Sequence, residues 1–195
     1  MSSQTISQPD RDATPRWLTH YYFTRAAIAA AWFVAAFTVG KSSPTTAAVL
    51  LVLYPAWDSL TNLVDARRSG GLVSNHSQAF NTVISALATI GIAGALTQDF
   101  HAVMAVFGAW AIAAGLFQLV TGLRRRKIGA QWAMILAGAQ SALVGAFFIK
   151  QALATTPVGI TDIAPYAAFG ALYFFVSAVW LIAAQARRRA SVRAA

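Results

Sequence analysis

The stretch that decides the fold is FHAVMAVFGAWAIAAGLFQLVTGL, residues 100–123, which is followed at once by the basic cluster Arg124-Arg125-Arg126-Lys127. The stretch contains no Asp, Glu, Lys or Arg. At 1.5 Å per residue, a helix of this length is about 36 Å long, which is enough to cross about 30 Å of hydrocarbon. The sequence therefore predicts a transmembrane helix that ends in a cluster of positive charge.

Five more apolar runs of similar length lie on either side of this stretch. Because backbone groups in hydrocarbon have no water to bond, each run is expected to be helical. The whole chain agrees, with 57% hydrophobic and only 11% charged residues. We predict an all-α polytopic membrane protein whose six-helix transmembrane domain covers 21–187, between a disordered tail over 1–20 and a basic tail over 188–195. The six runs are 21–40, 45–64, 79–96, 100–123, 131–150 and 163–184.

The positions of the basic residues predict how the helices are oriented. Of the 15 Lys and Arg residues, 13 fall on one side of the alternating spans, and only Lys41 and Lys150 fall on the other. Cytoplasmic loops carry the excess of Lys and Arg in membrane proteins. We therefore expect both termini on the cytoplasmic side of a bacterial inner membrane.

For a soluble protein, the net charge of +9 would make nucleic-acid binding a candidate function. Here the basic residues lie at the ends of apolar runs, where they meet anionic lipid headgroups. We therefore expect the partner to be the lipid bilayer, with anionic headgroups at the cytoplasmic face, and no nucleic acid. Self-association as a homo-oligomer is left open.

The even-numbered runs resemble one another. Each contains an aromatic residue, a small residue or Pro, Ala and a bulky residue, and each ends in basic residues. The pattern predicts three two-helix hairpins inserted the same way round. The alternative is that small and aromatic residues recur by chance in any apolar helix. The repeated segments are YPAW at 54–57, FGAW at 107–110 and FGAL at 169–172.

The FGAW segment, the helix that closes on Arg124, and the Trp and Gly/Ala-rich helix that follow resemble the HdeD-like family of small bacterial membrane proteins. The resemblance is best over 103–150 and weaker over the first and third hairpins. It implies a six-helix inner-membrane protein, linked in some members to acid or other stress resistance, with no established catalytic residues. Pro55 and Asp58 in the second run depart from the family pattern.

One polar pattern lies inside a predicted span. Asp58, Asn62 and Asp65 are spaced i, i+4 and i+7, so they share one face of the second helix in its cytoplasmic half. Pro55 removes a backbone hydrogen bond one turn earlier. This candidate intramembrane polar site is either a proton or ligand site, or a structural ion pair in which Asp58 neutralises Arg25 of the first span. Arg25 alternatively extends to the headgroups without a partner.

The sequence offers few residues for other kinds of site. There is no Cys and no Glu, and no phosphate loop, nucleophile triad or metal-ligand spacing is present. We therefore expect no catalytic residue, no cofactor, no metal and no enzyme activity. Two functions stay open: a non-enzymatic role in stress tolerance, or a small proton or cation channel or transporter that uses the Asp58 face. A dry interior would favour the first, and a cavity continuous across the bundle the second.

Overall fold

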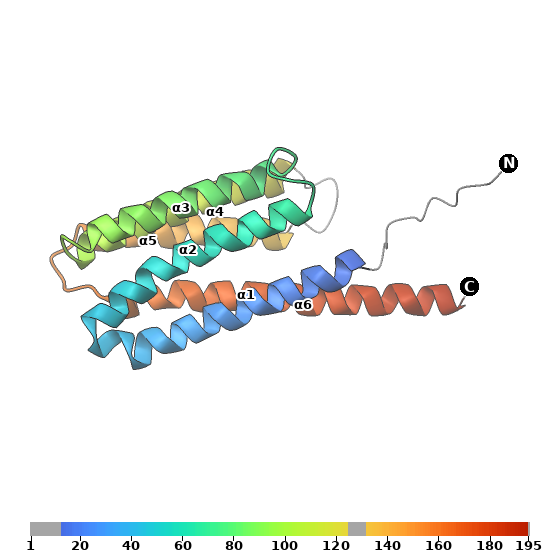
Figure 1. Ribbon diagram of the computed structural model, residues 1–195, viewed down its shortest axis with the longest axis horizontal. Helices are drawn as coiled ribbons and strands as arrows, with labels where there is room; N and C mark the ends of the chain where they lie inside the picture. The colour runs from blue at the N-terminus through green and yellow to red at the C-terminus, as the bar shows by residue number, and fades with distance from the viewer. Residues whose placement is uncertain (1–12, 125–131, 195) are drawn as a thin grey trace. The chain divides into compact units, whose positions relative to one another are not determined.

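The computed structural model describes residues 13–124 and 132–194, and these ranges consist of helices joined by short turns (Figure 1). Six of the helices are α-helices, and a single 3-10 turn precedes the second of them. The all-helical prediction is therefore confirmed for the described residues. The bounds are α1 Ala13–Thr38, η1 Gly40–Ser42, α2 Pro44–Arg68, α3 His76–Ala95, α4 Phe100–Arg124, α5 Trp132–Ala152 and α6 Ile160–Ala194.

All six α-helices contain a segment that is long and apolar enough to cross a membrane. The shortest segment, Ile135–Ala152, has 18 residues and is therefore about 27 Å long. The longest, Ile160–Arg187, has 28 residues. Their lengths match the hydrocarbon core of a bilayer. The chain is a multi-pass membrane protein.

Parts of both predicted tails are helical. α1 begins at Ala13, so residues 13–20, which the sequence assigned to a disordered tail, are helical. Pro15 is tolerated there because the first turn of a helix has no backbone partner for its N–H groups. α6 continues to Ala194, through most of the predicted basic tail, because Ala and Arg favour helix and positive charge favours a helix C-terminus. Residues 1–12 and 195 lie outside the described residues.

The helices α2, α4 and α6 each begin with a side chain that accepts a backbone hydrogen bond. Such a cap satisfies one of the N–H groups that have no partner within the helix. Together with the apolar composition, the caps explain why these helices start where they do. Ser43 Oγ accepts from the Thr46 N–H at 3.2 Å, Asp99 Oδ1 from the Ala102 N–H at 2.8 Å, and Asp162 Oδ2 from the Gly159 N–H at 2.8 Å.

The chain forms two compact units. The larger unit contains Trp32–Ala167, and the smaller unit joins the chain up to Ala31 with the chain from Ala168 onward. In the larger unit α2 packs against α3, α3 against α4, and α4 against α5 (Figure 1). These helices are consecutive, as the short joints predict.

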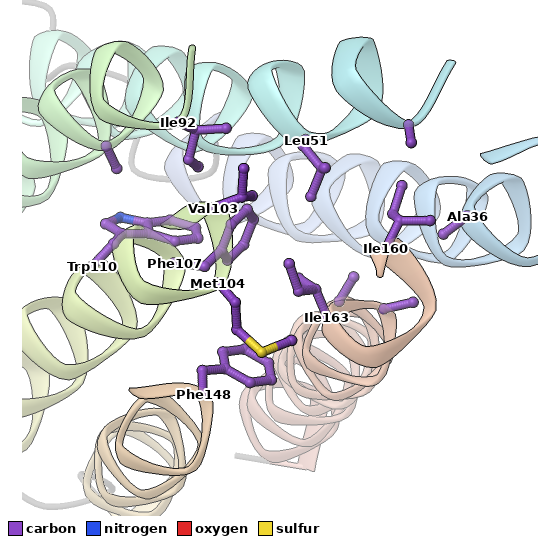
Figure 2. Close-up of a cluster of buried hydrophobic side chains, with 14 of the residues drawn as sticks. Ala36, Leu51, Ile92, Val103, Met104, Phe107, Trp110, Phe148, Ile160 and Ile163 are labelled. Atoms are coloured by element: carbon purple, nitrogen blue, oxygen red, sulfur yellow. The ribbon is translucent and has the colours of Figure 1, made fainter. Parts of the chain in front are cut away.

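A single hydrophobic cluster fills the larger unit, and Figure 2 shows part of it. Its largest fully buried side chains come from four different helices and include Leu51, Ile92, Met104, Phe107 and Ile163. Polar atoms at its edge are paired, since the Trp32 indole N–H donates to the Leu50 carbonyl at 2.7 Å. Trp110 of this cluster also belongs to the site described below.

Glycines bring the backbones of α4 and α5 into contact. A Cβ added at Gly115 would lie 2.6 Å from the Gly138 carbonyl oxygen, and one at Gly145 would lie 2.6 Å from the Gly108 carbonyl oxygen. These distances are shorter than any real Cβ contact, so a larger residue has no space at either position. Small residues at helix interfaces permit this close approach in membrane proteins.

Candidate functional site around Asp58

Asp58 lies in the middle of α2, inside the span. At 1.5 Å per residue its Cα is about 15 Å from the Arg68 end of the helix and about 21 Å from the Pro44 end. Its side chain is half-buried, whereas Asn62, one turn later, is buried. The i, i+4 spacing places both side chains on the same face, as the sequence predicts.

The Asp58 carboxylate is bonded to side chains of its own helix and of α3. Asp58 Oδ2 accepts from the Ser85 hydroxyl at 2.8 Å and from the Asn62 amide at 3.0 Å. The Ser85 oxygen in turn accepts from the Trp110 indole N–H of α4 at 3.0 Å. Because the indole only donates, the chain of donors runs from Trp110 through Ser85 to Asp58. One chain of hydrogen bonds thus joins three helices.

The Ser85 and Trp110 part of this hydrogen-bonded chain is buried. Ser85 is fully buried, and Trp110 is 6% exposed. A buried polar group without a partner costs about 1–3 kcal/mol, so these bonds matter most where water is absent. The Asp58 carbonyl is also used, since it accepts from Asn62 Nδ2 at 2.8 Å and Thr61 Oγ1 at 3.0 Å. α2 therefore turns its polar groups toward one another and toward α3.

Aromatic rings form the side of the site next to Trp110. The Tyr54 ring, one turn before Asp58, lies 6.1 Å from the Trp110 ring and 4.8 Å from the Trp32 ring. Tyr166 lies 5.9 Å from Trp110, and its hydroxyl is 2.9 Å from Ser141 Oγ. Tilted and edge-to-face contacts of this kind add to the stability of a core.

Asp65 lies apart from the Asp58 carboxylate. Its Oδ2 accepts from the Gln78 amide of α3 at 3.1 Å, and its Oδ1 accepts from Ser69 at 3.4 Å. The third residue of the predicted face therefore forms a separate contact between α2 and α3. The spacing along α2 does not predict this bond to Gln78, because Gln78 belongs to α3.

Arg25, the predicted partner of Asp58, belongs to the smaller unit. Its Nη1 donates to the Tyr21 hydroxyl at 2.9 Å, and its guanidinium carbon lies 4.1 Å from the centre of the Phe174 ring. The cation therefore packs against an aromatic face. Because Arg25 and Asp58 belong to different units, their ion pair stays a prediction.

Ser85 and Trp110 belong to the site, although the sequence did not predict them. Ser85 is one of several hydroxyl residues in α3, and nothing in its spacing distinguishes it. Trp110 ends the repeated FGAW segment, so the repeat gave a signal for a special position but not for its hydrogen bond. Both residues belong to other helices than Asp58, which is why local spacing did not reveal them.

The side chains of the site supply hydrogen bonds and charge. Among the described residues, no three His, Asp or Glu side chains gather as metal ligands would. His20 and His101 instead bond to backbone carbonyls, of Arg16 at 2.8 Å and Thr156 at 3.0 Å. What the site offers is a carboxylate with an oriented hydroxyl and indole, which can stabilise the bundle or hold a proton.

Comparison of the chain with protein-family models, with curated proteins and with solved structures found no match. The resemblance to the HdeD-like family therefore stays a prediction from the residues over 103–150.

Proposed function

We propose that this chain is a non-enzymatic inner-membrane protein that helps cells to tolerate stress such as acid, by acting on membrane integrity or by binding a partner. The observation that carries the proposal is the hydrogen-bonded Asp58 carboxylate, which receives donors from Ser85 and Asn62 inside a packed unit. In this interpretation the site holds α2, α3 and α4 together and performs no reaction.

The packing of the larger unit supports this proposal over transport. Leu51, Ile92, Phe107 and Ile163 are fully buried, and the α4 and α5 backbones touch at Gly115 and Gly138. Close packing of this kind resists the passage of ions, because a charge inside the membrane needs polar groups or water around it. The family resemblance supports the role in stress tolerance.

The proposal also covers the orientation of the chain in the membrane and the repeat of three two-helix hairpins. Both termini lie in the cytoplasm, since 13 of the 15 Lys and Arg residues fall on that side. The six helices form three hairpins, α1 with α2, α3 with α4, and α5 with α6. The caps at the starts of α2, α4 and α6 support the repeat, because the second helix of each hairpin then begins with a side chain that accepts a backbone hydrogen bond. The basic clusters contact anionic lipid headgroups.

A second candidate function is proton or cation transport. Asp58 favours it, because ionisable groups at membrane depth frequently mark ion pathways. The donors from Ser85 and Trp110, and the Asp65–Gln78 contact closer to the Arg68 end, place further polar groups along α2 and α3.

Proton flux in liposomes separates the two candidates. The purified protein is reconstituted with a pH-sensitive dye inside the vesicles, and a pH gradient with a potassium diffusion potential is applied. We expect the native protein to match both protein-free vesicles and the Asp58→Asn variant. A flux that requires the native Asp58 would replace the first proposal with the second. Survival of a deletion strain after acid challenge, with and without the native protein, tests the stress role itself.

A further inference from the structure

The smaller unit has an unusual charge balance. Its described residues, 13–31 and 168–194, include six Arg and one His but no Asp or Glu. The positive charge therefore has no carboxylate within this part of the unit. Four of the six arginines follow one another closely near the end of α6, at 187, 188, 189 and 193.

The contact between α1 and α6 brings two exposed arginines to the same region of this unit. Gln185 Nε2 donates to Thr19 Oγ1 at 3.5 Å, which joins the last part of α6 to the first part of α1. Arg16 lies three residues before Thr19, and Arg187 lies two residues after Gln185; both are exposed. Each is within about one turn, or 5 Å of helix rise, of the Thr19–Gln185 bond. We call Arg16 and Arg187 the basic end of the smaller unit.

Aromatic rings lie immediately next to the basic end, on the side of the apolar spans. Trp17 and Tyr21 are 5.6 Å apart, and Tyr21 and Tyr22 are 5.5 Å apart. The Tyr22 ring stacks on Phe174 of α6 at 6.1 Å. Trp and Tyr concentrate at the level of the lipid headgroups, where one side of the ring is apolar and the other is polar. The rings therefore place the basic end at the boundary of the bilayer.

Arg25 adds positive charge to the same region. It starts deeper in the span, and the bond from its Nη1 to the Tyr21 hydroxyl directs its guanidinium back toward the basic end. The Arg25 guanidinium also lies over the face of the Phe174 ring. The charge and the aromatic belt thus point to an anionic group at headgroup depth, next to apolar chains.

We propose that the basic end of the smaller unit binds the headgroup of an anionic phospholipid, with Arg16 and Arg187 on the phosphate and the acyl chains beside the Trp17–Tyr22 rings. Arginine suits this role because its planar guanidinium donates two parallel hydrogen bonds to phosphate. The inference deepens the proposed contact with anionic headgroups and rests on it. It names one site among several basic clusters, and it does not depend on the role of Asp58.

Lipid retention by the full chain tests the site. The native protein in a neutral detergent is titrated with phosphatidylglycerol or phosphatidylcholine, and native mass spectrometry measures the apparent affinity for the first bound lipid. The test variant is Arg16→Gln with Arg187→Gln. The matched control is Arg67→Gln with Arg68→Gln, which removes the same charge from two exposed arginines at the end of α2. Circular dichroism in detergent checks that both variants are folded.

We expect the native protein and the control to prefer phosphatidylglycerol equally, because Arg67 and Arg68 lie outside the proposed site. The test variant should bind it about 30-fold more weakly, because both arginines of the site are lost. Equal loss in both variants would overturn the site but leave the general contact with anionic lipid standing. No preference for phosphatidylglycerol in the native protein would overturn both.

Two further measurements complete the test. Arg16→Lys with Arg187→Lys keeps the charge but removes the guanidinium fork, and should bind phosphatidylglycerol about fivefold more weakly than Arg67→Lys with Arg68→Lys. Equal affinity of these two variants would contradict the proposal even if the Gln variant did not fold. Inorganic phosphate at millimolar concentration should not displace the bound lipid; displacement would show that a free anion is the ligand instead.

Discussion

The hydroxyl of Ser85 donates a 2.8 Å hydrogen bond to the carboxylate of Asp58, and so joins the middle of α3 to the middle of α2. The same oxygen accepts from Trp110 of α4. A single fully buried hydroxyl is therefore the connection among three helices. Its loss affects two partners at once, which makes it a sensitive point in the larger unit.

Replacing Ser85 by Ala should destabilise the protein. The change leaves the Trp110 N–H and one bonding position of Asp58 without this partner, at a cost of about 1–3 kcal/mol. Thermal unfolding in detergent, followed by circular dichroism, measures it. Ser74→Ala, at an exposed position in the turn between α2 and α3, is the control and should change little. Equal melting temperatures for the two variants would contradict the structural role of this bond.

Trp110→Phe tests whether the chain of donors acts as a unit. Phenylalanine keeps most of the ring contacts with Tyr54 and Phe107 but removes the indole N–H. If the chain is coupled, the double variant Ser85→Ala with Trp110→Phe should lose less stability than the two single losses added together. Simple additivity would indicate that the two hydrogen bonds are independent.

The predicted ion pair between Asp58 and Arg25 is tested by a double-mutant cycle in detergent. Removing one partner of a buried pair leaves an uncompensated charge, which costs about 3–5 kcal/mol, whereas replacing both partners is often near neutral. Asp58→Ala should therefore lower the melting temperature more than Asp58→Ala with Arg25→Leu does. Additive losses would show that the two residues do not interact. A fully stable Asp58→Ala variant that loses a proton flux would make Asp58 a functional site.

The glycine contact between α4 and α5 predicts that a Gly→Ala substitution changes stability differently at different glycines. Gly115→Ala would place a Cβ 2.5 Å from the Ala142 backbone nitrogen, so the helices must separate and the melting temperature should fall. Gly94→Ala is the matched control, because it adds the same methyl group at a helical position with no atom within 4 Å. The control should be neutral or slightly stabilising, since Ala favours helix by up to about 1 kcal/mol. Equal effects of the two changes would refute the close approach.

Orientation is tested by single cysteines in this Cys-free chain. In intact cells, cysteines at Ser74 and Ser191 should be protected from a membrane-impermeant thiol reagent, and a cysteine at Thr156 should react. All three positions are exposed. The expectation follows from the positive-inside rule. Labelling at Ser191 from outside would reverse the proposed topology.

The sequence was sufficient for the number and approximate position of the spans, and insufficient for their ends. Hydrocarbon requires long apolar helices, so composition and length alone identified all six. α1 begins eight residues earlier than the predicted domain, at Ala13, and α6 reaches Ala194. Polar residues outside an apolar run are compatible with either helix or tail, so hydropathy gave no end point there.

The candidate site was likewise predictable from the sequence only in part. The sequence by itself determined that Asp58 and Asn62 share one face of a membrane helix, because the helical period fixes neighbours within one segment. Only the tertiary structure decided that this face meets Ser85 and that Ser85 meets Trp110, because these contacts depend on how each helix is rotated about its axis and packed against the next. Most side chains around such helices are apolar, so hydropathy does not fix the rotation. The packing of particular side chains and glycines sets it, and this becomes visible only when the helices are placed together.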